Sequence, residues 1–151
     1  MGSVSRLVVL VSCSILVLAV TSGAGASPQR ASTAASLCTV AKGVAVSLEK
    51  APSTGSLTTA QGQALFKNNL GKILAARGAL IGAAPASLKA NMRQAIGVFA
   101  LFKTDLSKVH YNFGALVSKP ALTKGLSTAI TKAEPAFHHL KAYFTNTCHF
   151  K

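Results

Sequence analysis

The chain has 151 residues, of which 16 are Lys or Arg and three are Asp or Glu, so its formal net charge at pH 7 is +13. This length suits one domain with a core of its own. The three acids, Glu49, Asp105 and Glu134, are too few and too scattered to build a carboxylate metal centre or an acid-rich catalytic site.

The first 26 residues have the three parts of a secretory signal peptide. Arg6 supplies a positive start, and residues 7–20 form an uncharged apolar run. Ala24 and Ala26 provide the small side chains that a signal peptidase accepts. We therefore expect cleavage between Ala26 and Ser27, and export of the remaining chain.

Two alternatives to a cleaved signal peptide remain for this segment. It could stay as a membrane anchor, but its apolar run is shorter than the ~20 residues that a span needs. Cys13 could be lipidated, because the residues before it resemble a lipobox. However, the apolar run continues well past Cys13, whereas a lipobox ends such a run.

Removal of the signal peptide would divide the chain into two further parts. We expect 27–32 to be a disordered leader and 33–151 to form one helical bundle domain. Because Arg6 is the only basic residue lost, 15 basic residues would face three acids, a net charge of +12. We expect no transmembrane span after cleavage, a monomer, and a location that is extracellular or associated with the envelope.

The exported chain would keep two cysteines, Cys38 and Cys148. Oxidising compartments favour pairing, and two cysteines allow a single intramolecular bond. The bond would close a loop of roughly a hundred residues, which stabilises the fold by about 4–5 kcal/mol in the chain-entropy model. We therefore predict a Cys38–Cys148 disulfide.

Pro and Gly residues divide the domain into four segments in which apolar residues recur three and four positions apart. These segments predict helices at 32–50, 59–82, 86–117 and 119–146. Amphipathic helices with short joints predict an all-α, up-and-down four-helix bundle. That topology places the start of the first helix beside the end of the last, so one disulfide would join the two ends of the domain.

The third segment carries the clearest apolar pattern, with spacings that alternate between four and three. Its members are Leu88, Met92, Ala95, Phe99, Phe102, Leu106, Val109, Phe113 and Leu116. Such a seam is typical of helices that pack at about +20° in bundles. In the fourth segment, Pro135 removes a backbone hydrogen bond and predicts a kink or a split.

The second segment has a stripe of small residues, Gly71, Ala75, Gly78 and Gly82. Small side chains let another backbone approach closely, so the stripe favours tight helix packing. Each glycine also destabilises a helix by about 1 kcal/mol relative to Ala. We therefore expect this helix to be the least regular of the four.

The histidines do not form a recognisable metal-binding or catalytic pattern. His138 and His139 are adjacent, so they point about 100° apart on a helix. No His pair lies at i and i+4, and the sequence has no nucleophile elbow, P-loop or dinucleotide fingerprint. We therefore expect no metal site, no catalytic residues and no enzymatic activity.

The basic residues are dominated by lysine, with 12 Lys and four Arg. One interpretation is a solvated surface that keeps an exported protein soluble. The other is electrostatic attachment to an anionic envelope polymer or to acidic lipid headgroups, because the charge exceeds the ~2–8 that solubility requires. Export and the scarcity of Arg argue against nucleic acid as the natural partner.

The signal peptide, the early cysteine and the ending "LKAYFTNTC" (140–148) together resemble small secreted single-disulfide α-helical proteins of actinobacterial type. Those proteins carry one Cys near the mature N-terminus and one near the end, after a Leu-x-x-Tyr-like turn. Most of them are uncharacterised, so the resemblance implies architecture and export rather than an activity.

The stretch "KPALTKGLSTAITKAEPAFHHLKAYFTNTC" (119–148) is similar, more weakly, to the mycobacterial haemophore-like domain. That domain is also secreted, helical and closed by one bridge, and such proteins are thought to hold haem through Tyr and His. The chain is longer than that domain. The resemblance implies these candidate haem ligands: His110, Tyr111, His138, His139 and Tyr143.

The sequence thus predicts a secreted, cationic, disulfide-closed helical protein that binds a partner at or outside the cell envelope. The alternative is a carrier that holds haem or another apolar ligand between its helices. The first predicts binding that weakens steeply with salt, and the second predicts a pocket where helix packing is least regular.

Overall fold

The computed structural model describes residues 28–50 and 59–150, which form six α-helices. These are α2 (Pro28–Ser47), α3 (Thr59–Ala75), α4 (Arg77–Ala83), α5 (Ala86–Ser107), α6 (Phe113–Val117) and α7 (Pro120–Asn146). The prediction of an all-α fold is confirmed. The number of helices differs from the expected four, because the second and third predicted helices are each interrupted.

The N-terminal predictions fall largely outside this part of the chain. The expected signal peptide, including Cys13 and the cleavage residues Ala24, Ala26 and Ser27, lies outside the described residues. The helix α2 begins at Pro28. Residues 28–32, which we expected to be part of a disordered leader, are therefore helical.

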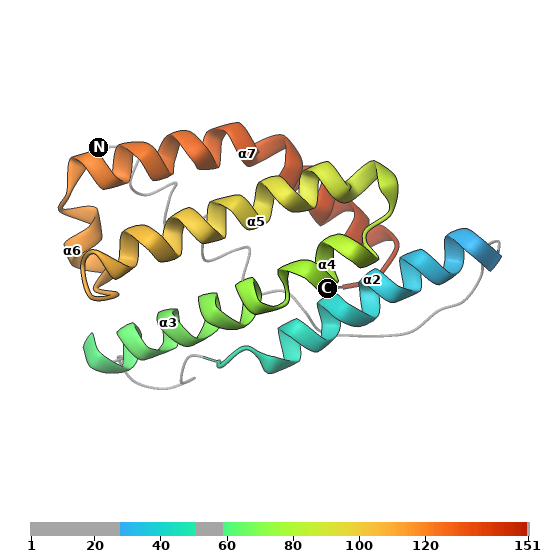
Figure 1. Ribbon diagram of the computed structural model, residues 1–151, viewed down its shortest axis with the longest axis horizontal. Coiled ribbons are helices and arrows are strands. Elements are labelled where there is room, and N and C mark those ends of the chain that lie inside the picture. The colour runs from blue at the N-terminus through green and yellow to red at the C-terminus, as the bar shows by residue number, and fades with distance from the viewer. Residues whose placement is uncertain (1–27, 51–58, 151) are drawn as a thin grey trace.

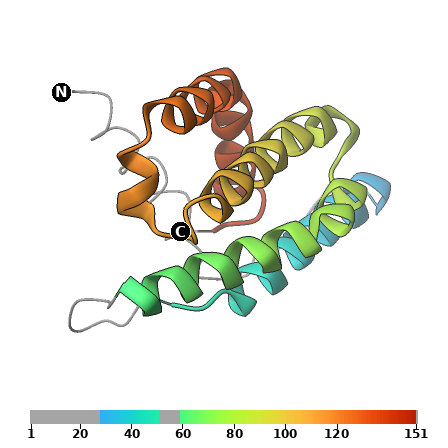
Figure 2. The ribbon, with the colours of Figure 1, turned by 60° about the vertical axis from the view of Figure 1, so that its left-hand side comes forward.

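The helix α5 lies at the centre of the fold (Figure 1). Its most extensive contact is with α7 on one side, while α3 and α4 pack against its other side. The N-terminal helix α2 packs mainly against α4, and the short helix α6 packs against α7. Figure 2 shows the same order from another direction, with α5 between α7 and α3.

The third predicted helix, 86–117, is interrupted at residues 108–112. His110 and Tyr111 have φ angles of 52° and 60°, in the left-handed region that a right-handed helix does not use. The Asn112 side chain then accepts a hydrogen bond from the N–H of Ala115 at 3.0 Å and caps α6. All nine residues of the apolar seam are nevertheless at least partly buried, and Leu116, beyond the break, is fully buried.

The second predicted helix is divided at Ala76, where ψ is 0°. The hydrogen-bond ladder almost continues through the break. The Ala76 N–H donates to Lys72 O at 3.1 Å, and the Leu80 N–H donates to Ala76 O at 2.9 Å. The irregularity expected for this segment is therefore confined to a local break at Ala76, across which the helical hydrogen bonds largely continue.

The last predicted helix, 119–146, agrees with α7, which runs through Pro135 without splitting. Figure 1 shows α7 bending in its second half, as expected for a proline kink. The Gln94 side chain of α5 donates to the backbone oxygen of Lys132 at 2.7 Å. Pro135 has no N–H to donate to the carbonyl of Thr131, next to Lys132, so the Gln94 bond holds α5 against the turn in which the ladder is interrupted.

The buried side chains form two clusters along the molecule. The first contains Leu37, Ala41, Leu80, Ala84, Leu88, Met92, Ala95, Ile96, Leu140 and Phe150. The second contains Leu70, Val98, Phe102, Leu106, Val109, Leu116, Leu126 and Ala133. Phe137 packs against both clusters and meets Phe99 edge to face at 6.3 Å. The helices α5 and α7 run through both clusters and so join the two ends of the fold.

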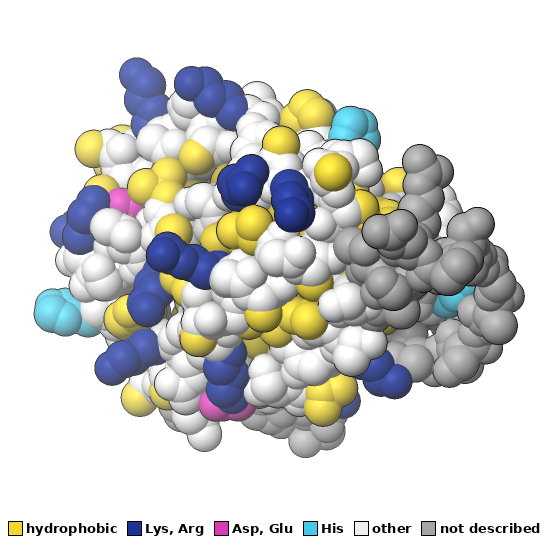
Figure 3. Space-filling model, turned by 45° about the vertical axis from the view of Figure 1, so that its right-hand side comes forward, with side chains coloured by type: hydrophobic (Ala, Val, Ile, Leu, Met, Phe, Trp, Pro, Cys, Tyr) yellow, Lys and Arg dark blue, Asp and Glu magenta, His cyan; other side chains and the backbone are white. Residues whose placement is uncertain are grey.

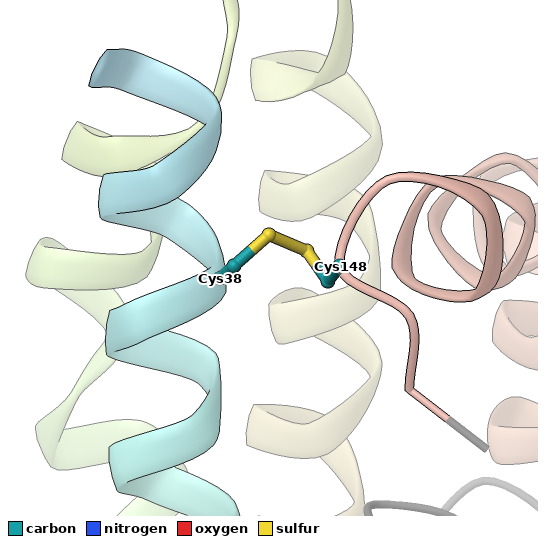
Figure 4. Close-up of a disulfide and its surroundings, with 2 residues drawn as sticks. All are labelled: Cys38 and Cys148. Atoms are coloured by element: carbon teal, nitrogen blue, oxygen red, sulfur yellow. A yellow bond between two sulfur atoms is a disulfide. The ribbon is translucent and has the colours of Figure 1, made fainter. Parts of the chain in front are cut away.

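A disulfide between Cys38 and Cys148 closes the molecule, as predicted. The two Cα atoms are 5.3 Å apart and separated by 110 positions. Figure 4 shows the bond joining the side of α2 to the chain just after α7. Beyond it, His149 has φ 55° and turns the chain back, so that the Phe150 ring stacks on Phe144 at 5.6 Å and is buried.

Candidate functional site

The helix α3 is fixed to the chain just beyond α2 by the buried side-chain amide of Asn69. Its Oδ1 accepts the Glu49 N–H at 2.8 Å, and its Nδ2 donates to the Glu49 carbonyl at 2.9 Å. Both backbone groups lie just beyond α2, where the chain can no longer satisfy them within a helix. Asn69 therefore fixes the position of Glu49 relative to α3.

The Glu49 carboxylate is bound by two α3 side chains. Lys72 Nζ is 3.1 Å from Oε1, and Asn68 Nδ2 donates to the same oxygen at 3.1 Å. The hydrogen bond from Lys72 is the main reason that the pKa of Glu49 lies below its ordinary value of 4.5. Desolvation opposes this shift, while Asn68 and the charge of Lys72 add to it. Lys72 also donates to Ser47 O at 2.8 Å, at the C-terminal end of α2.

A shallow depression of about 590 Å³, open to solvent, lies along the same face of α3. It is lined by Glu49, Lys67, Asn68, Gly71, Lys72, Ala75, Lys103 and Tyr111. The lining residues come from the chain just beyond α2, from α3, from α5 and from the turn after α5. This face is therefore assembled from segments that are distant in the sequence.

The small-residue stripe contributes to this open face, and our interpretation of the stripe was wrong. A Cβ atom placed on Gly71, Gly78 or Gly82 would meet no atom of the described residues within 4 Å, so no backbone in this part of the chain packs closely against these glycines. Gly71 and Ala75 instead line the depression. Their lack of bulk leaves room between the longer side chains around them.

Two lysines in the depression, Lys67 and Lys103, have no acidic partner among the described residues. Each of the three acids is already close to another basic group: Glu49 to Lys72 at 3.1 Å, Asp105 to Lys108 at 2.8 Å and Glu134 to His138 at 3.8 Å. Lys103 is also partly buried. The depression therefore has a surplus of positive charge that a bound anion could neutralise.

The surplus of cations extends over the rest of the surface. Figure 3 shows Lys and Arg side chains spread over the face in view, with few acidic side chains between them. The basic residues without an acidic partner in the described part of the chain are Lys42, Lys50, Lys67, Arg77, Lys89, Arg93, Lys103, Lys119, Lys124, Lys132 and Lys141. Among them, Lys67 and Lys103 both line the depression along α3.

The structure divides the candidate haem ligands into two groups. His110 and Tyr111 lie in the turn after α5, whereas His138, His139 and Tyr143 lie on α7. His139 Nδ1 is 3.2 Å from the amide of Asn91, near the start of α5. At 1.5 Å per residue, that position is about 25 Å from the end of α5, so the two groups do not share a site.

The candidates on α7 differ in environment. His138 and His139 are exposed, while the Tyr143 hydroxyl is buried without a hydrogen-bond partner among the described residues. Desolvation raises the pKa of Tyr143. In the same part of the chain, no three His, Cys, Asp or Glu side chains gather as a metal site would need.

Sequence reasoning missed the polar contacts of Asn68 and Asn69. The available signal was the Asn-Asn pair itself, because Asn is unfavourable in the middle of a helix unless its side chain has a specific partner. The partner, Glu49, lies 20 positions earlier and across a connection, so no local pattern links it to Asn69.

These features define an all-helical protein closed by one disulfide, with a surplus of cations and a lysine-lined depression. In residues 28–50 and 59–150, no helix combines the length and the apolar character needed to cross a membrane. Comparison with protein-family models, with curated proteins and with solved structures finds no match to this chain.

Proposed function

We propose that this is an exported protein that binds anionic material at or outside the cell envelope and catalyses no reaction. The observation that carries the proposal is the imbalance of charge. Each acid is within 4.0 Å of a basic group, whereas most lysines have no acidic partner in the described residues. An anionic polymer or an acidic lipid surface would supply the missing counter-charges.

Export is proposed from two features. Residues 1–26 have the pattern of a signal peptide, and disulfides such as Cys38–Cys148 persist in oxidising compartments. We further propose that the fold is an up-and-down four-helix bundle whose second and third helices are interrupted. The resemblance to small secreted single-disulfide helical proteins of actinobacterial type supports the same assignment.

Binding should be tested with the disulfide-bonded protein and vesicles of phosphatidylglycerol, with phosphatidylcholine vesicles as the uncharged control. A linear inorganic polyphosphate serves as the polymer. Raising the salt from about 0.01 M to about 0.15 M shortens the screening length from about 30 Å to about 8 Å, so binding should weaken steeply. Binding that ignores salt, or that is equal on both lipids, would contradict electrostatic attachment.

Export and the alternative of a ligand carrier can be tested together by native mass spectrometry of the protein from culture medium. A chain that starts at Ser27 and is two hydrogens lighter than its reduced form would support export of the disulfide-closed protein. A bound mass that survives purification would favour a carrier, and its value would distinguish haem from lipid.

A further inference from the structure

We propose that the depression along α3 binds a phosphate group of an anionic polymer, with Lys67 and Lys103 as its ligands. This inference rests on the proposed electrostatic function and gives it a location and a chemical class of partner. Glu49 is the one acid in the lining, and Lys72 and Asn68 already bind it. An entering phosphate would therefore meet the two ammonium groups that have no acidic partner in the described chain.

The residue types in the depression suit a phosphate. A guanidinium grips carboxylates and phosphates through a planar fork, whereas a lysine ammonium binds phosphate oxygens as a point charge and needs no fixed orientation. All the cations in the lining are lysines, and no arginine contributes. The partial burial of Lys103 removes some of the water that would screen its charge.

The shape of the depression favours a segment of polymer over an enclosed small molecule. Its volume of about 590 Å³ is within the usual range for ligand sites. However, it is open to solvent, so a chain could enter and leave along α3. Among the described residues, no atom lies within 4 Å of where a Gly71 Cβ would be, so this part of the lining is open.

The first test compares two variants that have the same net charge. Lys67→Gln/Lys103→Gln removes the two proposed ligands, and Lys124→Gln/Lys132→Gln removes two exposed lysines of α7, on the opposite side of α5 (Figure 1). Binding of linear polyphosphate is measured by calorimetry at fixed salt. We expect the first pair to weaken binding about five- to tenfold and the control pair less than about twofold, since exposed charge contacts are individually modest.

The second test fills the depression without changing the charge. Gly71→Gln places a side chain in the open space, and Gly78→Gln does the same on α4, outside the lining. Both are exposed or partly exposed helical positions where Gln is a better helix former than Gly, so neither should lower Tm. We expect Gly71→Gln to reduce polyphosphate binding at least threefold, and Gly78→Gln to leave it unchanged.

The outcomes separate this inference from the function on which it rests. Equal losses from the two lysine pairs would overturn the local site and leave diffuse electrostatic binding intact. Binding to phosphatidylglycerol vesicles without binding to polyphosphate would also overturn it, as would equal affinity for free inorganic phosphate and for the polymer. If the unaltered protein binds neither polymer nor vesicle, both proposals fail.

Discussion

At the scale of single residues, Asn69 links α3 to the chain just beyond α2. Its amide makes two bonds, of 2.8 Å and 2.9 Å, to the backbone of Glu49. We predict that Asn69→Ala lowers the free energy of unfolding by about 2 kcal/mol, because it leaves these partly buried backbone groups without partners. Chemical denaturation of the oxidised protein measures the change.

The neighbouring amide provides a matched control for this prediction. Asn68 is exposed, and its bonds reach only the side chain of Glu49. Asn68→Ala should therefore lower stability by less than about 0.5 kcal/mol. Equal effects of the two substitutions would show that the Asn69 bonds do not fix α2 to α3.

Glu49 predicts a pH dependence of stability. Because its pKa is lower in the folded protein than its ordinary value of 4.5, the charged form favours folding. This contribution is complete above pH 4.5 and is lost as the pH falls through the lower folded value. We expect the unfolding free energy to decrease in that acid range, and to decrease less in Glu49→Gln.

Denaturation curves at several pH values below 5 would measure this effect. Glu134→Gln is the control, because the Glu134 carboxylate is exposed and its contact with His138 is 3.8 Å long. An identical acid dependence in the Glu49→Gln variant and the unaltered protein would contradict the role given to the Lys72 hydrogen bond.

Part of the candidate site could be predicted at this scale, and part could not. The excess of lysine and the scarcity of acids are properties of composition, so the sequence predicts a cationic surface. The location of the depression depends on Lys103 and Tyr111 lying beside α3, which is set by tertiary packing. No local pattern contains that information.

At the scale of helices, the apolar periodicity predicted burial better than it predicted backbone continuity. Leu106, Val109 and Leu116 are all buried as the seam requires, although the helix stops between the first two. The turn at 108–112 keeps the apolar residues directed toward the core, so the spacing of buried residues continues past the end of α5. Asn112, a good N-cap residue, was the signal for the new helix start, whereas Ala76 offers no such signal.

The disulfide is the most consequential link between helices. We predict that Cys38→Ser/Cys148→Ser lowers the free energy of unfolding by about 4–5 kcal/mol, because the unfolded chain regains the freedom of a loop of 110 positions. Urea denaturation with and without the bond measures this difference. An unchanged midpoint would mean that the unfolded chain is not restricted by the link.

A second variant separates the bond from the packing around it. Phe150→Ala keeps both cysteines but removes a buried ring that stacks on Phe144. It should lower stability by about 3 kcal/mol, as for other buried aromatic truncations. If the losses of unfolding free energy from the cysteine and Phe150 substitutions add up in a protein that carries both, the disulfide and the Phe150 ring act independently.

At the scale of the whole molecule, the net positive charge makes the basic side chains on the surface repel one another. We predict that Tm rises when salt is raised from about 0.01 M to about 0.15 M, because screening relieves this repulsion. Each 1 kcal/mol gained would raise Tm by about 4 °C in a domain of this size. Lys124→Glu/Lys132→Glu should show a smaller rise, and calorimetric scans at both salt concentrations test this.

The Cys38–Cys148 bond also sets the route that mechanical force takes through the molecule. A pull applied to the chain before Cys38 and after Cys148 passes from one end to the other through the two sulfur atoms. The helices between these positions carry no tension while the covalent bond holds. A protein anchored by one end and dragged by the other in flowing medium would therefore keep α3, α4, α5, α6 and α7 folded, and its lysine-lined face would keep its shape under load.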